Sequence, residues 1–404
     1  MSKLTSTCAA AAVVTAALIA VGCESDNRTS RSTQTGMFSA GAGQDVPEGY
    51  GYVSRHVLTV DQTNANQVRL TPINTIATVD AIENSTNVKA VTRMTDYKGA
   101  YEADVPRVSP DGQTILYQLR EEYGNINLWT MASETGTNKI RNTEGDNLNF
   151  YGAWSTKGDK IIFSSNRTDQ NSHLWEIKAF GGGGGLRRIT DSREADFWVH
   201  EAPTANDILA YTRYQIGVPT IWTYNRKTYL STQLRVGRQP QISPDGQKIV
   251  YTVFDEQEGH WNIWTMSMDG SQPTQLTSND ADNITPSWHP SSKWIIFASN
   301  KGSVAATARG SKAVKNETRL HNFDIWMMHA NGEHVSQLTV NGSDDDNPVF
   351  SPDGKTFYFS SNRGHSYEDL NKVGTGRDIW RATITDDVVS MDIAQPSKDV
   401  PPAK

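Results

Sequence analysis

The sequence predicts an all-β fold, a six-bladed β-propeller in which six four-stranded sheets form a closed ring. Three observations predict it. One unit recurs six times along the 404 residues, and each unit carries signals for several short strands. The strand missing from the last unit is found ahead of the first. Repeats of this length, with short strands separated by turns, are the sequence signature of a propeller.

The clearest copy of the unit occupies residues 238–266. Ser243-Pro244-Asp245-Gly246 suits a tight turn, because Pro presets φ at its second position and Gly tolerates its fourth. The β-branched and aromatic run 249–254 is typical of a strand buried on both faces. Residues 261–264 predict a third strand and residues 274–277 a fourth.

The six copies share the end of the third strand, an aliphatic residue followed by Trp. These pairs are Leu128-Trp129, Leu174-Trp175, Ile221-Trp222, Ile263-Trp264, Ile325-Trp326 and Ile379-Trp380. The Ser-Pro-Asp-Gly turn is intact at 109–112, 243–246 and 351–354. It is altered at 155–158 and 289–292, and it is barely recognisable near 203–207. The third copy is therefore assigned partly from its spacing.

A fourth strand follows each of the first five copies, at 138–141, 187–190, 233–235, 275–277 and 337–339. No comparable strand follows Trp380, but one stands alone at Val91–Thr95, before the first copy. We expect this N-terminal strand to complete the last blade, so that no sheet edge is left open at the joint. A linear array would instead need distinct capping repeats.

The repeat resembles that of the TolB-type propellers over about residues 88–384. The resemblance rests on Phe-Ser-Ser-Asn-Arg at 163–167 and 359–363, followed by Asp-Ile-Trp and Gln-Leu-Thr. It implies the same six-bladed fold. Such repeats occur in binding proteins, in peptidase propeller domains and in some single-domain lyases, so the resemblance leaves the function open.

The N-terminus predicts a bacterial lipoprotein. Residues 1–22 hold Lys3 and a short apolar stretch that suits a secretory signal, and small residues precede Cys23 as in a lipobox. Cys23 would carry the lipid and anchor the chain. The resemblance to lipoproteins implies the outer membrane as the destination. The alternative is a plain signal with an incidental Cys. Cys8 would leave with the signal, which excludes a disulfide or a cysteine-based active site.

The rest of the chain divides by composition. Residues 23–48 predict a flexible tether, 49–87 an N-terminal extension with strands at 53–60 and 68–77, and 385–404 a disordered tail. The long insertion at 302–322 is either a solvated loop or a flap that contacts a partner. The five glycines at 181–185 predict a hairpin loop, because no phosphate-binding Lys-Ser/Thr follows them.

The charge balance excludes nucleic acid as a partner recognised by bulk charge. The chain has 45 acidic residues against 38 Lys and Arg, one of which is Lys3 of the signal. Acidic residues gather in the connections from each fourth strand to the next blade, which meet at one mouth of the channel. The candidates for binding a ligand or cation, calcium among them, are Asp104, Asp146, Asp196, Asp282 and Asp346. The alternative is that Asp simply suits tight connections.

The other chemical motifs are weak. No three histidines share one register, and no Gly-x-Ser-x-Gly elbow is present. Trp198, Trp261 and Trp294 are not explained by the repeat. We therefore predict a lipid-anchored scaffold of the cell envelope, more a binding protein than an enzyme, that holds a protein or ligand partner at its acidic mouth and insertion loops. The alternative is a polysaccharide lyase or hydrolase, which would need His and Asp side chains to converge in the channel.

Overall fold

The computed structural model describes residues 57–60, 68–71, 83–97, 101–121, 124–169, 171–180, 184–202, 207–279, 281–301, 322–364 and 376–385. The predicted signal, Cys23, the tether and the tail from 386 lie outside these residues, as does nearly all of the insertion at 302–322. Every regular element described is a strand. The described residues contain no helix of the length and apolarity needed to cross a membrane.

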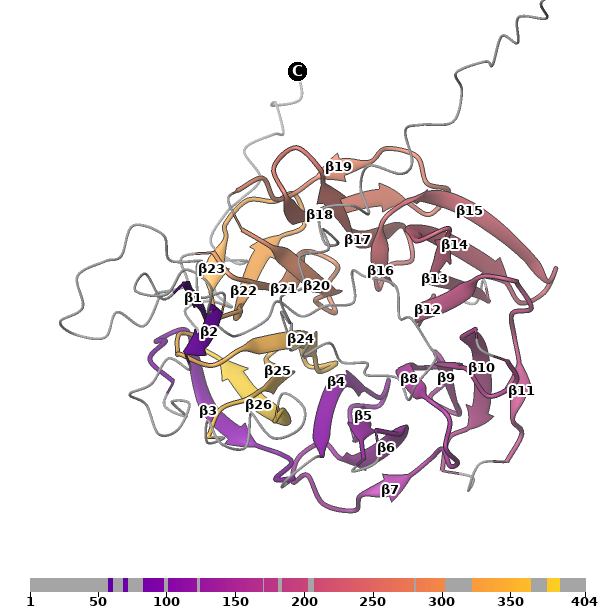
Figure 1. Ribbon diagram of the computed structural model, residues 1–404, viewed down its shortest axis with the longest axis horizontal. Coiled ribbons are helices and arrows are strands. Elements are labelled where there is room, and N and C mark those ends of the chain that lie inside the picture. The colour runs from indigo at the N-terminus through magenta and orange to yellow at the C-terminus, as the bar shows by residue number, and fades with distance from the viewer. Residues whose placement is uncertain are drawn as a thin grey trace, which may run out of the picture.

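Six antiparallel four-stranded sheets surround a central axis, as the sequence predicts (Figure 1). Blades one to three are β4(Glu102–Val108), β5(Thr114–Arg120), β6(Ile126–Ala132), β7(Ile140–Arg141); β8(Asn149–Trp154), β9(Lys160–Ser165), β10(His173–Lys178), β11(Arg187–Arg188); and β12(Ala195–Glu201), β13(Ile208–Gln215), β14(Val218–Asn225), β15(Leu230–Val236). Blades four to six are β16(Arg238–Ile242), β17(Lys248–Asp255), β18(His260–Ser267), β19(Thr274–Gln275); β20(Asn283–Trp288), β21(Trp294–Ser299), β22(Asp324–His329), β23(Ser336–Gln337); and β24(Asp345–Phe350), β25(Thr356–Ser361), β26(Asp378–Ile384), β3(Val88–Arg93).

The N-terminal strand closes the ring. In Figure 1 the indigo β3 lies beside the yellow β26, and Trp380 pairs with Arg93 in the register of the two strands. Thr95 then accepts a hydrogen bond from the amide of Ile379 (2.9 Å) and donates to Asp378 (2.6 Å). Thr143, Thr190, Thr277 and Thr339 accept from the third strand of their own blades in the same way. The predicted closure is confirmed.

Among the described residues, six hydrophobic clusters each lie between one pair of neighbouring blades, and a seventh gathers residues of blades one to three, most of them from the inner strands. Strand β5 shows how the second strands serve two clusters. Ile115 and Tyr117 pack against blade six, while Leu116, pointing the other way, packs against blade two. The cluster between blades six and one is built like the others, so the joint between the chain ends is packed as a normal interface.

The Phe-Ser-Ser-Asn-Arg motif holds the first strand in place. In blade two, Ser165 donates to the side chain of Asn149 (2.9 Å) and Asn166 accepts from the amide of Leu148 (2.9 Å). The Arg167 guanidinium lies 5.2 Å and 5.1 Å from the ring centres of Phe163 and Trp175. The repeated Trp is therefore a stacking surface for the repeated cation.

Each inner strand contains a bulge with one non-glycine residue at positive φ, between 49° and 57°. These bulge residues are Val105, Tyr151, Trp198, Gln239, Thr285 and Asn347. A non-glycine residue rarely adopts this conformation, and six at one structural position mark a constraint of the fold. The bulges lie where the inner strands face the channel.

The extension before the propeller forms a hairpin and a contact strip. Strands β1(Val57–Val60) and β2(Val68–Thr71) pair antiparallel with one another. Residues 83–87 lie against blades five and six, where the amide of Val340 donates to Glu83 (2.6 Å) and that of Asn84 donates to the Val340 carbonyl (3.1 Å).

Replacing Thr95 with Val should weaken the closure of the ring. The change removes both hydrogen bonds of the Thr95 hydroxyl at a buried position, so we expect a loss of about 1–3 kcal/mol in the free energy of unfolding. Chemical denaturation measures it. Thr92→Val, at an exposed position of the same strand, is the control and should change stability by less than about 0.5 kcal/mol. Equal stability of the two variants would contradict the closing role.

Candidate functional site: the propeller channel

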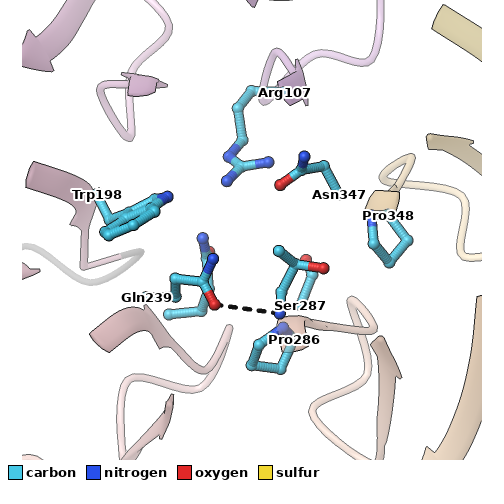
Figure 2. Close-up of a pocket in the computed structure, with 9 residues that line it drawn as sticks. Arg107, Trp198, Gln239, Pro286, Ser287, Asn347 and Pro348 are labelled. Carbon is cyan, nitrogen blue, oxygen red and sulfur yellow. Dashed lines mark hydrogen bonds between the residues drawn. The ribbon is translucent and has the colours of Figure 1, made fainter. Parts of the chain in front are cut away.

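The channel narrows to a neck at the level of the bulges. Its described lining includes Arg107, Trp198, Gln239, Ser287 and Asn347, whose side chains point toward one another in Figure 2. Gln239 accepts from the amide of the neighbouring blade's Thr285 (3.3 Å), the dashed line in that view. The free space is about 10 Å³, room for about one water molecule. The space found between these side chains is therefore too small to hold a substrate.

At one end of the neck, three carboxylates surround one guanidinium. Arg377, which precedes β26, lies 3.6 Å from Asp104, 3.5 Å from Asp344 and 3.6 Å from Asp346, and all four side chains are buried. Burial raises the pKa of Asp346, while Arg377 opposes this rise. The Asn347 amide also donates to Asp104 (3.0 Å). We call Arg377, Asp104, Asp344 and Asp346 the Arg377 cluster. The end of the ring that holds this cluster is called the mouth face.

The structure brings together two of the five predicted aspartates, Asp104 and Asp346. Asp196 forms an ion pair with Arg213 (2.7 Å) within blade three. Asp282 accepts the amide of Trp261 (2.9 Å), and Asp146 is exposed at the rim.

The reason is their register. Asp104 and Asp346 each stand one residue before the positive-φ bulge residue of their strand. Asp196 stands two residues before its bulge residue, Asp282 three residues and Asp146 five residues. They do not form one ring, and a cation of the chain itself already lies between the two that meet. Within the described ranges, no group of three or more His, Cys, Asp or Glu side chains is placed to hold a metal ion such as the expected calcium.

Blades two to four line the mouth face with aromatic rings. Tyr151 and Trp198 lie with ring centres 4.4 Å apart, and Phe150 and Phe197 stack behind them at 5.5 Å. The Arg238 guanidinium lies 6.0 Å from the ring centre of Trp198 and 3.4 Å from that of Trp261.

Trp198 and Trp261, two of the three tryptophans that the repeat does not explain, thus hold the buried guanidinium of Arg238 between their rings. The third, Trp294, packs edge-on against His329. Sequence reasoning missed Arg107, Arg238 and Arg377. Arg238 stands one residue before the bulge of its strand, as Asp104 and Asp346 do, a register that becomes visible only in the folded strand.

The histidines near the blades make separate structural contacts. His173 hydrogen-bonds Asp169 (3.0 Å), and His289 hydrogen-bonds the Gly354 carbonyl of the next blade (3.0 Å). His200 accepts the amide of Ile242 (3.2 Å) through Nδ1.

A second buried group of charges lies where residues 83–87 meet the ring. Arg363 is fully buried and pairs with Asp345 and with Glu83 (2.8 Å). Asp324, nearby, accepts from Gln337 (3.1 Å). Burial, then the charges of Asp345 and Glu83, raise the pKa of Asp324 to about 9, so its carboxyl is protonated at neutral pH.

At the opposite end, which we call the turn face, the channel widens into a cavity of about 320 Å³. Turns between first and second strands surround it and touch one another around the ring. Asp245 donates its amide to Ser292 of the next blade (3.0 Å), for example, and Thr156 donates to the carbonyl of Ala202 (2.6 Å). The cavity and the neck share Arg107, Gln241 and Ser287.

Comparison with known proteins agrees with this architecture. No protein-family model matches the chain. The Tol-Pal system protein TolB of Anaeromyxobacter dehalogenans is 37% identical over 92 residues, which are 21% of this chain and 20% of that protein. The uncharacterized protein Atu1656 of Agrobacterium fabrum is 27% identical over 119 residues, 30% of this chain and 34% of that protein. The chain thus spans about a fifth to a third of the length of the curated relatives that it matches.

A solved structure assigned to TolB from Agrobacterium tumefaciens superimposes with a TM-score of 0.53 at 18% identity, over 73% of this chain and 97% of that one. At this identity the likeness shows the fold. The closed ring of six four-stranded sheets around a channel defines a six-bladed β-propeller. The repeat motifs and the match to part of a TolB protein show that the chain is similar to TolB-type propellers.

Replacing Arg377 with Met should destabilise the protein by about 3–5 kcal/mol at pH 7.5, because three buried carboxylates lose their counter-charge. Without the guanidinium these carboxyls bind protons more tightly in the folded than in the unfolded chain. The variant should therefore lose stability as pH rises from about 4.5 to about 7.5. Denaturation at both pH values measures this, with the exposed Lys248→Met as control. An Arg377→Met protein as stable as the wild type would contradict the role of the cluster.

Replacing Asp324 with Asn should flatten the pH dependence of stability. The raised pKa of Asp324 means that its contribution is fully present below about pH 4 and is lost as pH rises toward about 9. Asn does not titrate, so the variant should gain at least ~1 kcal/mol relative to the wild type between pH 5 and 8. Thermal or chemical denaturation across this range tests it. Asp146→Asn, at the exposed rim, should leave the profile unchanged.

Proposed function

We propose that the protein is a lipid-anchored binding scaffold of the cell envelope, with the mouth face of its propeller as the surface that receives a protein partner. The observation that carries the proposal is the channel itself. The space found at its neck holds about one water molecule, and the three carboxylates that meet there surround Arg377. Such a ring offers a rigid surface for recognition.

The rim of the mouth face suits a partner with a basic segment. Glu144 and Asp146 are exposed in the connection between blades one and two. Asp191 and Asp96, in other connections of the same face, have side chains 88% and 60% exposed, and each forms an ion pair of 2.9 Å, with Arg188 and with Arg93 respectively. Carboxylates gathered on one face attract positive charge over a range set by salt. The insertion at 302–322 belongs to the proposal as a further contact.

The same geometry favours the scaffold over a polysaccharide lyase or hydrolase. That alternative needs a base, or a metal held by His and Asp, in the channel. In the described part of the channel, the residue that meets Asp104, Asp344 and Asp346 is an arginine, which does not give up its proton.

The envelope location rests on the resemblance of the N-terminus to a lipoprotein signal and on the match to a Tol-Pal protein. Cys23 would be the lipidated residue, placing the propeller at a membrane surface, with the outer membrane as the proposed site. The tether 23–48 would let the ring reach its partner.

The test is affinity capture from detergent-solubilised envelope with a full chain carrying Cys23→Ser. We expect one stoichiometric protein partner, whose capture weakens when salt rises from about 50 mM to about 300 mM. Introducing Glu144→Lys together with Asp146→Lys should weaken capture about tenfold. On fractionation, the wild type should stay with membranes and the Cys23→Ser chain should not.

Glu134→Lys is the matched control, because Glu134 is exposed on a turn of the opposite face. It should leave capture unchanged. Failure to capture any protein, or equal loss with the rim and control variants, would refute binding at the mouth face.

A further inference from the structure

The cavity at the turn face has the size of a site for a small molecule. Its volume of about 320 Å³ lies at the lower end of the range for such sites, about 300–1,000 Å³. At its inner end the cavity meets the neck, where the space found is only about 10 Å³. A molecule that enters from the turn face would therefore come to rest on the side chains between the cavity and the neck.

One ring of residues lies at this inner end, which we call the floor ring. In each inner strand, the residue two positions after the positive-φ bulge residue lines the cavity, so each of the six blades contributes one side chain in the same register. The floor ring consists of Arg107, Ala153, His200, Gln241, Ser287 and Val349.

The floor ring is polar and uncharged on one side. His200, Gln241 and Ser287 come from β12, β16 and β20, the inner strands of three consecutive blades. Among the described residues, the side chains of Gln241 and Ser287 have no hydrogen-bond partner. The Ser287 side chain points toward the centre of the channel in Figure 2. These three side chains form a polar arc that faces the apolar Ala153 and Val349.

His200 adds a donor to the arc without adding a charge. A backbone N–H only donates, so the bond from the Ile242 amide (3.2 Å) requires an unprotonated Nδ1 on His200. Burial, and then the charge of Arg107, lower the pKa of His200 to about 3, so the ring is neutral and carries its proton on Nε2. Within the described part of the chain, no side chain or carbonyl accepts this proton.

The charged residues of the cavity lining already have partners within the protein. Arg107 donates to the Pro106 carbonyl (2.8 Å) and makes a further interaction, so its guanidinium is engaged by the chain itself. Glu201 pairs with Arg226 (2.7 Å) and accepts from the amide of Thr156 (2.8 Å). The groups left to an occupant are the uncharged ones of the polar arc.

The wall above the floor ring is apolar. Trp154, Trp288 and Phe350 line it, together with a proline from each of four turns. The indole N–H groups are used within the protein: that of Trp154 donates to the Arg107 carbonyl (3.0 Å) and that of Trp288 to the Gln241 carbonyl (3.0 Å). The wall therefore offers carbon surface to an occupant.

We propose that the turn-face cavity binds an uncharged small molecule that carries a primary amide on an apolar body, with the amide on Gln241 and the body against Trp154 and Trp288. The Gln241 side chain has an N–H donor and a C=O acceptor, so it can pair with another amide through two hydrogen bonds. His200 would donate its Nε2–H to the carbonyl of the ligand, and the Ser287 hydroxyl would accept the second N–H. Each member of the arc thus gains a partner. The site lies on the face opposite the acidic rim and does not depend on the partner proposed for that rim.

Calorimetric titration of the full chain carrying Cys23→Ser tests the site with matched probes. The amide is 3-phenylpropionamide; 4-phenylbutan-2-one replaces its NH2 group with methyl, and 3-phenylpropan-1-ol carries a single hydroxyl. We expect the amide to bind at least about tenfold more tightly than the ketone or the alcohol, since both leave members of the arc unpaired. A ketone or alcohol that binds as tightly as the amide, or no binding of the amide below about 10 mM, would overturn the proposal.

Gln241→Met should reduce the affinity for the amide to that for the ketone and leave the affinity for the ketone within about twofold of the wild type. Ser287→Ala should weaken amide binding at least about threefold, and it provides the test if Gln241→Met does not fold. Gln233→Met, exposed on the outer strand of blade three, is the matched control and should change neither affinity.

Amide binding that is unchanged in both Gln241→Met and Ser287→Ala would contradict the assignment of the polar arc. The mouth-face variants Glu144→Lys and Asp146→Lys should leave this binding intact, which separates its failure from that of the scaffold.

Discussion

The pairing of β3 with β26 is the interaction on which the ring depends. Each blade packs against two neighbours, so a ring without this pair would expose the edge of β26 and leave blade six one strand short. The pair joins residues almost 300 positions apart in sequence, and Thr95 accepts the same hydrogen bond from the third strand that is found in four of the other blades. Because the closing contact is so distant in sequence, the ring can be completed only after the last blade exists.

Closure also fixes the chemistry of the channel. It brings Asp104 of blade one beside Asp346 of blade six and sets Arg377 between them. The charges are thus matched across the joint between the two ends of the chain. The mouth face thus holds paired buried charges, while the cavity at the turn face is lined by Trp154, Trp288 and Phe350.

The repeat was predictable from the sequence because its parts are local. The Ser-Pro-Asp-Gly turns, the aliphatic-Trp strand ends and the lone strand near Thr95 specify number, order and closure of the blades without reference to tertiary contacts.

The site was less predictable, since it depends on where strands lie relative to one another. Counting residues from the turns does not show that Asp196 and Asp282 lie at other positions along the channel axis than Asp104. That position depends on the distance in sequence from the bulge, and only the folded strand reveals the bulge. Arg377 follows a connection that carries no repeat signal, and its meeting with three carboxylates depends on the packing of two blades that are distant in sequence.

The bulges of the inner strands have a consequence for how this protein can diversify. The same backbone shape is held at six places by side chains as different as Val105, Tyr151 and Gln239. Since neighbouring sheets and turns fix that shape, the exchange of one such side chain alters the bore or polarity of the axis without disturbing the frame. A propeller of this kind can change the lining of its channel one blade at a time. Sequence differences between such propellers would then concentrate at the six bulge positions around the axis.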